Sequence, residues 1–257
     1  MWNIIGGQVS SQNTYKMKFL VKSSLCLLLV ATTGMAQRYI EQSRPNLTQI
    51  KEAEQRLSEL GYWTGPIDGR FDEASRSALI AFQKFECRPP TGELTLEELE
   101  KIRHSTSPEA RETGYEHVEI DVDRQLLLFV NQEGAVKVLP VSTGSGKQFV
   151  DEGQTSVAYT PRGRFVVYEK SHGWEYGPLG SLYFANYISG GVAIHGSRNV
   201  PTQPDTHGCI RVPVFAAREL SQLMPLGTIV LVYDKISFVS GKAWAENPKL
   251  KQTASIE

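Results

Sequence analysis

Three residues of types that often do chemistry lie close together in one part of the sequence: His195, His207 and Cys209. A cysteine thiol becomes a good nucleophile when its pKa falls, and a nearby imidazole can lower that pKa. Gly208, just before the cysteine, allows a tight turn whose exposed N–H groups could hold the oxyanion that forms during acyl transfer. The pattern therefore favours acyl transfer by a thiolate nucleophile.

The spacing alone leaves three other interpretations open. A single free cysteine is often a small buried hydrophobic residue, and a single histidine is often a hydrogen-bonded core residue. His195, His207 and Cys209 could instead be zinc ligands, but the paired spacing typical of structural zinc sites is absent and no fourth ligand is evident. A papain-like protease is disfavoured because its cysteine precedes its histidine, whereas His195 comes first here.

The segment that positions these residues is predicted to consist mainly of β-strands. From Tyr115 onward apolar and polar residues alternate, which is typical of half-buried strands. We expect strands near 118–122, 125–130, 136–141, 165–168, 192–195 and 228–233, and one helix over 214–224. His195 then ends a strand, where a rigid scaffold presents side chains to a cleft.

Residues 46–103 precede this segment and have the pattern of three short helices, beginning at Asn46, near Asp72 and at Thr95. So few apolar residues predict a bundle that is only just large enough to fold independently. The sequence places Phe71, Phe82 and Phe85 in the core of this bundle. Tyr62 and Trp63 lie in the loop after the first helix and are the better candidates for a binding surface.

Composition and charge narrow the class of protein. The chain has 257 residues, of which 40% are hydrophobic and 21% charged, with 22 glycines and 13 prolines. This is a globular, turn-rich composition. The formal net charge is −1 and no basic block occurs, so nucleic-acid binding has no electrostatic support.

The N-terminus has the features of an export signal. Three lysines precede a short apolar run at 25–31, and small residues follow it, which predicts a signal peptide within 1–36 that is cut after Ala36. The apolar run is shorter than the roughly 20 residues that span a bilayer, so no stable membrane span is expected. We expect an exported protein of the periplasm or cell wall.

Two cysteines, Cys87 and Cys209, remain after this cleavage. Cys87 follows the second helix, where a small apolar residue packed under the loop would hold an inert thiol. A Cys87–Cys209 disulfide is not expected, because the polar, unpatterned linker predicted at 105–114 does not favour the one arrangement that would bring the two cysteines together, and the bridge would consume Cys209.

Both modules resemble bacterial cell-wall proteins. The segment AEQRLSELGYWTGPIDGRFDEASRSALIAFQKF resembles a peptidoglycan-binding module. The segments STGSG (142–146), TPRGRF (160–165), YFANYISGGVAIHGS (183–197) and THGCIRV (206–212) resemble the catalytic domain of the L,D-transpeptidases. The implied fold is an α+β multidomain chain, with a small three-helix bundle at 44–104 followed by a mainly β, sandwich-like catalytic domain with one clear helix at 115–234. Residues 235–257 form a polar tail.

The resemblance also implies roles for individual residues. Cys209 would be the acylated nucleophile, His195 its proton acceptor and later donor, and His207 a supporting residue. The N–H groups of Gly208 and Cys209 would form the oxyanion hole. The residues that would bind substrate are Tyr183, Gly196, Ser197 and Arg211. No metal or cofactor is implied.

The implied reaction has two halves. Cys209 would attack a peptidoglycan tetrapeptide stem and release D-alanine, and the acyl group would pass to an amine of a second stem, giving a 3→3 cross-link. Water as acceptor would make the protein an L,D-carboxypeptidase, and an idle site would leave a non-catalytic wall-binding protein. Peptidoglycan is the expected partner, and carbapenems are the expected inhibitors.

Overall fold

The computed structural model describes residues 45–151 and 153–236. The predicted signal peptide and nearly all of the predicted tail lie outside these residues. Within them, no helix combines the length and apolar character needed to cross a membrane.

The three predicted N-terminal helices are present as α2 (Leu47–Glu59), α3 (Glu73–Phe85) and α4 (Leu96–His104). Each begins where a side chain satisfies free N–H groups of the first turn. Asn46 and Gln49 form a reciprocal capping box, Asp72 accepts from two backbone N–H groups, and Thr95 accepts from the N–H of Glu98. Local sequence signals therefore fix the starts of all three helices.

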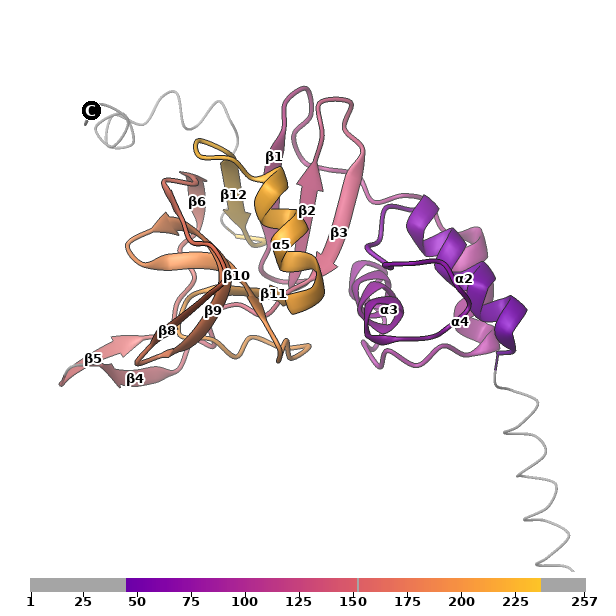
Figure 1. Cartoon of the computed structure of the whole chain (residues 1–257), viewed down its shortest axis with the longest axis horizontal. Helices are drawn as coiled ribbons and strands as arrows, with labels where there is room; N and C mark the ends of the chain where they lie inside the picture. Colours follow the sequence, from indigo (N-terminus) through magenta and orange to yellow (C-terminus); the bar gives the residue numbers. More distant parts are fainter. Residues whose placement is uncertain (1–44, 152, 237–257) are drawn as a thin grey trace, which may run out of the picture. The chain divides into compact units, whose positions relative to one another are not determined.

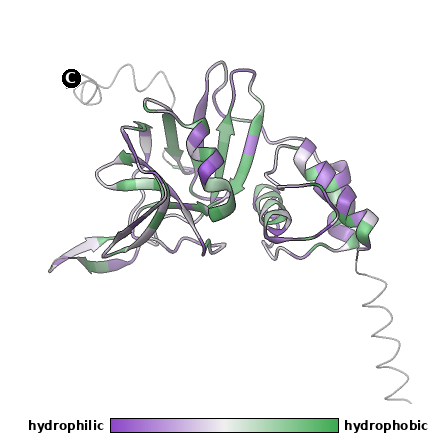
Figure 2. Cartoon of the chain, viewed as in Figure 1, coloured by the Kyte–Doolittle hydropathy of each residue, from purple (hydrophilic) through white to green (hydrophobic). Residues whose placement is uncertain are grey.

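A five-stranded sheet lies beside the helices, with the order β3-β2-β1-β12-β6. Its strands are β1 (His117–Asp121), β2 (Leu126–Val130), β3 (Val136–Pro140), β6 (Gly163–Val166) and β12 (Ile229–Tyr233). β1 pairs in parallel with β12, and the other neighbours are antiparallel. Figure 2 shows the central strands of this sheet as predominantly hydrophobic, which is typical of strands that are covered on both faces.

Alternate residues of β2 enter two different cores. Leu127 and Phe129 pack with β1, β12 and the helix α5 (Val214–Leu223), whereas Leu126, Leu128 and Val130 pack with the helices α2, α3 and α4. Successive strand residues point to opposite faces of a sheet, so the helical bundle covers one face of this one. The bundle shares its core with the sheet and is less independent than its composition suggests.

Tyr62 contributes to this shared core. It is 2% exposed, packs edge-to-face on Phe82 and forms an isolated parallel bridge to Val138 on β3. Gly61, just before it, approaches β3 so closely that an added Cβ would lie 2.4 Å from the carbonyl oxygen of Val136. The ring of Tyr62 is therefore a core group and the loop after α2 extends the sheet at its edge, although Tyr62 also lines the second cavity described below.

The segment 105–114 is also attached to the sheet. The backbone N–H groups of Arg111 and Glu112 both donate to the carboxylate of Glu119 on β1, at 2.8 and 3.0 Å. That carboxylate is fully buried and also accepts from Tyr233. The segment predicted to be a linker is thus held at its C-terminal end by a buried acceptor.

The second sheet carries the candidate site. Its order is β11-β10-β9-β7, with β8 pairing to β9, and its strands are β7 (Glu169–Lys170), β8 (Trp174–Gly177), β9 (Gly180–Ser189), β10 (Val192–Ser197) and β11 (Ile210–Pro213). Helix α5 agrees closely with the predicted helix and packs on β9 and β10. A separate hairpin of β4 (Gln148–Asp151) and β5 (Gln154–Val157) projects from the domain (Figure 1). The sequence patterns did not reveal β4, β5, β7, β8, β9 or β11.

Cys87 lies where α3 ends and is exposed, not packed under the loop as predicted. Its φ is +54°, in the left-handed region, and its N–H donates to the carbonyl of Lys84. The next N–H, of Arg88, donates to the carbonyl of Gln83. Cys87 therefore occupies a helix C-terminal position that usually holds glycine.

Candidate active site

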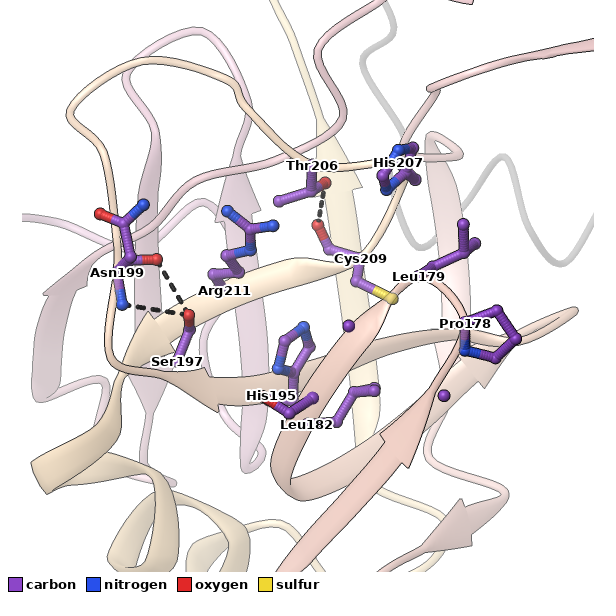
Figure 3. Close-up of a pocket in the computed structure, with 13 residues that line it drawn as sticks. Pro178, Leu179, Leu182, His195, Ser197, Asn199, Thr206, His207, Cys209 and Arg211 are labelled. Carbon is purple, nitrogen blue, oxygen red and sulfur yellow. Dashed lines mark hydrogen bonds between the residues drawn. The ribbon is translucent and has the colours of Figure 1, made fainter. Parts of the chain in front are cut away.

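Neighbouring elements of the second sheet bring the predicted catalytic residues to one cavity (Figure 3). His195 lies on β10, and Cys209 immediately precedes β11, which runs parallel to β10. The cavity has a volume of about 500 Å³, and the turn between β8 and β9 forms another wall. His195 lies within β10 and not at its end as predicted. It lies near Cys209 because the parallel register places His195 opposite Arg211, two residues after Cys209.

His195 is held as a neutral base. Its Nδ1 lies 3.0 Å from the carbonyl oxygen of Gly196, which can only accept, so Nδ1 carries the proton and Nε2 keeps a free lone pair. The ring is 5% exposed, and its burial, aided by the positive charge of Arg211 and opposed by the hydrogen bond to Gly196, lowers the pKa of His195 to about 4. At neutral pH this imidazole can accept a proton.

Cys209 is half-buried, and its Sγ lies 3.8 Å from the carbonyl oxygen of Gly191. Burial raises the pKa of the thiol, while the backbone N–H of Ala193 and the charge of Arg211 act in the opposite direction. Burial is the largest of these effects, so the resting group is a thiol. Such a group needs a base to become a nucleophile, and the neutral His195 lines the same cavity.

Two threonines fix the loop that carries the cysteine. Thr206 Oγ1 donates to the carbonyl of Cys209 at 2.7 Å and accepts from the N–H of Gly208 at 3.1 Å. Thr160 Oγ1 donates to the carbonyl of Gly208 at 2.7 Å. Gly208 has a φ of +149°, and an added Cβ would lie 3.0 Å from the carbonyl oxygen of Tyr159, so this turn requires glycine.

This arrangement changes the expected oxyanion hole. The N–H of Gly208 already donates to Thr206, so it is not free for a substrate oxygen in this structure. The N–H of Cys209 remains the predicted donor. Thr160 and Thr206 belong to the segments TPRGRF and THGCIRV, but the sequence indicates no role for either residue. Their function depends on hydrogen bonds that form only in the folded chain.

His207 lies on the rim of the cavity and is exposed. Its ring packs against Phe149 of the β4–β5 hairpin, with the ring centroids 4.6 Å apart. Among the described residues, no group of three or more His, Cys, Asp or Glu side chains is arranged to hold a metal ion. The ring of His207 is therefore positioned at the rim by its contact with the β4–β5 hairpin.

The predicted substrate-binding residues divide into two groups. Arg211 and Ser197 line the cavity. The guanidinium of Arg211 lies 3.6 Å from the carboxylate of Asp205, and Ser197 Oγ donates to the carbonyl of Asn199 at 2.9 Å. Both side chains already have partners within the chain, and Figure 3 shows Ser197 turned toward Asn199.

Tyr183 and Gly196 have packing contacts instead. Tyr183 packs against Trp174 with the rings tilted and their centroids 4.8 Å apart, and it is not among the residues that line the cavity. An added Cβ on Gly196 would lie 2.6 Å from the Cβ of Ala217, so glycine here lets α5 approach β10. Sequence reasoning missed the opposite wall, which includes Pro178, Leu179 and Leu182; the Gly-Pro-Leu-Gly turn at 177–180 was the signal that could have revealed it.

A second cavity, of about 970 Å³, lies between the loop after α2, the β2–β3 hairpin and α5. Trp63 lines it, and the ammonium of Lys137 lies 4.7 Å from the centroid of the Trp63 ring. Lys137 also pairs with Glu219 at 3.3 Å. An aromatic ring bordered by charged groups suits a polar ligand with apolar faces.

Each of the two modules matches the model of a known protein family. Residues 115–232 match the model of the L,D-transpeptidase catalytic domain, and residues 46–102 match that of a putative peptidoglycan binding domain. A comparison with curated protein sequences finds no match.

Solved structures give a similar result. A crystal structure of an L,D-transpeptidase from Xylanimonas cellulosilytica is 36% identical, with a TM-score of 0.69, and the match covers 74% of this chain and 95% of that one. An L,D-transpeptidase from Stackebrandtia nassauensis is 20% identical, with a TM-score of 0.42 and coverages of 71% and 89%. An L,D-transpeptidase solved with imipenem is 16% identical, with a TM-score of 0.36 and coverages of 46% and 58%.

Proposed function

This chain belongs to the L,D-transpeptidase family, and we propose that it modifies peptidoglycan through a thioester formed on Cys209. One observation carries the proposal: a half-buried thiol and a neutral, carbonyl-oriented imidazole line the same cavity. A thiol beside a base with a free lone pair is the arrangement that nucleophilic acyl transfer requires.

The first half-reaction acylates the enzyme. His195 Nε2 takes the Sγ proton of Cys209 as the sulfur attacks the carbonyl carbon of a tetrapeptide stem, and the N–H of Cys209 stabilises the oxyanion of the tetrahedral intermediate. The C–N bond then breaks, His195 returns the proton to the leaving amine, and D-alanine departs. The stem remains attached to Cys209 as a thioester.

The second half-reaction resolves the thioester. An amine of a second stem attacks the thioester carbonyl, His195 accepts the amine proton, and the C–S bond breaks to regenerate the thiol. The product is a 3→3 cross-link. Water in place of the amine would make the protein an L,D-carboxypeptidase. The two activities give different products, so product analysis distinguishes them.

The helical module would hold the enzyme on its polymer. The cavity that contains Trp63 combines surfaces of both modules, so glycan or stem bound there would lie on the same body as the catalytic site. Attachment to the polymer raises the effective concentration of substrate at the catalytic cavity. This role is supported by the match of residues 46–102 to a putative peptidoglycan binding domain.

We place this activity outside the cytoplasm, because residues 1–36 have the features of a cleaved export signal. Mass spectrometry of protein recovered from the periplasm or cell wall should find a mature N-terminus at Gln37. An intact N-terminus on cytoplasmic protein would contradict this location. A carbapenem is expected to acylate Cys209, since it presents a reactive carbonyl to the same thiol.

The decisive experiment is incubation of the mature chain with purified disaccharide-tetrapeptides, followed by mass analysis of the products. A cross-linked dimer that lacks one D-alanine supports the transpeptidase, and a tripeptide without dimer supports the carboxypeptidase. An unchanged substrate, with the thiol demonstrably free, would leave a wall-binding protein without catalysis.

A further inference from the structure

The helical bundle contains a buried lysine that the proposed reaction does not use. Lys84, on α3, is 7% exposed, and its Nζ donates to the backbone carbonyls of Gln125 and Val141, both at 3.2 Å. Among the residues that the structure describes, no carboxylate pairs with it. Burial lowers the pKa of Lys84 to about 7. Burying an ammonium group without a counter-ion is costly, so its two acceptors are its main compensation.

Both acceptors belong to the catalytic domain, at the point where β2 begins and β3 ends. Gln125 has a φ of +56° and is itself buried. Its side-chain amide donates to the carbonyl of Val122 and to Thr143 Oγ1, at 2.6 and 2.7 Å, and its Oε1 accepts from the N–H of Thr143 at 2.8 Å. The residue that Lys84 contacts thus holds Thr143 through two hydrogen bonds.

Thr143 in turn supports the nucleophile loop. Its carbonyl accepts from the N–H groups of Asp205 and Thr206, both at 3.0 Å. Thr206 is the residue whose hydroxyl bonds to the carbonyl of Cys209 and to the N–H of Gly208. A continuous series of hydrogen bonds therefore runs from Lys84 through Gln125, Thr143 and Thr206 to Cys209.

We infer that Lys84 is a positioning residue for Cys209: the wall-binding module holds the support of the nucleophile loop in place by donating to Gln125 and Val141. The module is then a part of the catalytic apparatus as well as an attachment to the polymer. The inference rests on the proposed function only in taking Cys209 as the reacting group. Lys84 itself touches no substrate.

The test compares Lys84→Met with Lys84→Arg in the full chain, in a Cys87→Ser background so that Cys209 is the remaining thiol of the mature protein. Two quantities are measured: the second-order rate of Cys209 alkylation by iodoacetamide, and kcat with KM on disaccharide-tetrapeptide. We expect Lys84→Met to lower the alkylation rate and kcat by about 10- to 100-fold with little change in KM, because a misplacement of about 1 Å costs up to roughly 10²-fold. Lys84→Arg keeps the donors and should recover part of this loss.

Leu79→Ala is the matched control, because Leu79 is fully buried on the same helix and has no donor. It should lower the unfolding temperature while leaving alkylation at the wild-type rate well below that temperature. Thr143→Val removes one of the two hydrogen bonds that join Gln125 to Thr143, the one from the Gln125 amide to Thr143 Oγ1, and should slow alkylation too. This second variant provides the test if Lys84→Met does not fold. Wild-type alkylation in Lys84→Met or Thr143→Val, or equal slowing in Leu79→Ala, would overturn the inference. Alkylation of Cys209 does not require the transfer reaction. A wild-type protein without transferase activity would therefore contradict the proposed function but not the inference about Lys84.

Discussion

His195 and Arg211 are register partners on the parallel strands β10 and β11, so a permanent cation lies beside a buried imidazole. The guanidinium disfavours protonation of His195 and also favours the thiolate form of Cys209. One charge therefore biases both partners toward the states that the reaction needs: a base without its proton and a thiol that can lose its own.

Replacing the nucleophile tests the mechanism most directly. Cys209→Ala should abolish both D-alanine release and cross-linking, because Cys209 is the one thiol among the residues that line the cavity. The fold and binding to sacculi should be nearly unchanged, since the small side chain is only half-buried. Release of D-alanine can be followed with stem peptides, and cross-linking that persists in this variant would refute the mechanism.

Substitution of the two histidines should lower kcat/KM by different amounts. His195→Ala removes the buried base and should lower kcat/KM by about 10²–10⁴-fold. His207→Ala removes an exposed ring that packs on Phe149 and should cost less. Steady-state kinetics of both variants, with circular dichroism to check the fold, would show the difference; a larger loss at His207 would reverse the two roles.

The pH profile follows from the neutral state of His195. The free enzyme needs this base unprotonated, so kcat/KM should fall only as the pH drops through the pKa of His195, which is about 4. Arg211→Met removes a charge that lowers this pKa, so the acid limb should move to higher pH. Arg218→Met, an exposed arginine on α5, is the control. An acid limb near the ordinary histidine value in the wild type would contradict the buried, neutral base.

Attachment to the polymer should depend on Trp63. Trp63→Ala should weaken binding to purified sacculi about tenfold, because truncation of an aromatic anchor typically costs more than about 1 kcal/mol. Turnover of soluble disaccharide-tetrapeptide should not change, since Trp63 lies outside the catalytic cavity. Tyr168→Ala, which removes another half-exposed aromatic residue, should bind normally. Equal binding by the wild type, Trp63→Ala and Tyr168→Ala would show that this cavity does not contribute to attachment.

Cys87 offers a test of backbone strain. Its φ of +54° is a conformation that glycine adopts without a steric penalty, so Cys87→Gly should stabilise the protein by a few tenths to about 1 kcal/mol. Cys87→Ser keeps the strain and should leave activity unchanged. Urea unfolding measures the first effect, and non-reducing peptide maps should contain no Cys87–Cys209 peptide. A bridged peptide in most of the material would favour redox control instead.

Sequence patterns predicted what local interactions determine. The caps at Asn46, Asp72 and Thr95 and the apolar face of α5 are encoded within a few residues, so these helices were predictable. The types and spacing of His195 and Cys209 favoured acyl transfer but left other interpretations open, and only the resemblance to L,D-transpeptidases implied their roles. Lys84 could not be recognised, because a lysine in a helix looks like a solvated residue until the sheet that buries it is known. Thr160 and Thr206 are similar cases: their roles depend on acceptors that are distant in sequence or on the path of the loop.

The two-sided packing of β2 limits how such enzymes can exchange parts during evolution. Leu126, Leu128 and Val130 would face solvent if another targeting module replaced residues 46–104, and the chimaera would expose a flat apolar surface that invites aggregation. A successful recombinant would have to bring its own complementary helix face or alter every second residue of that strand. Gene fusion can join such modules in one chain, but the apolar face of β2 and the helices that cover it remain complementary only when they are inherited together.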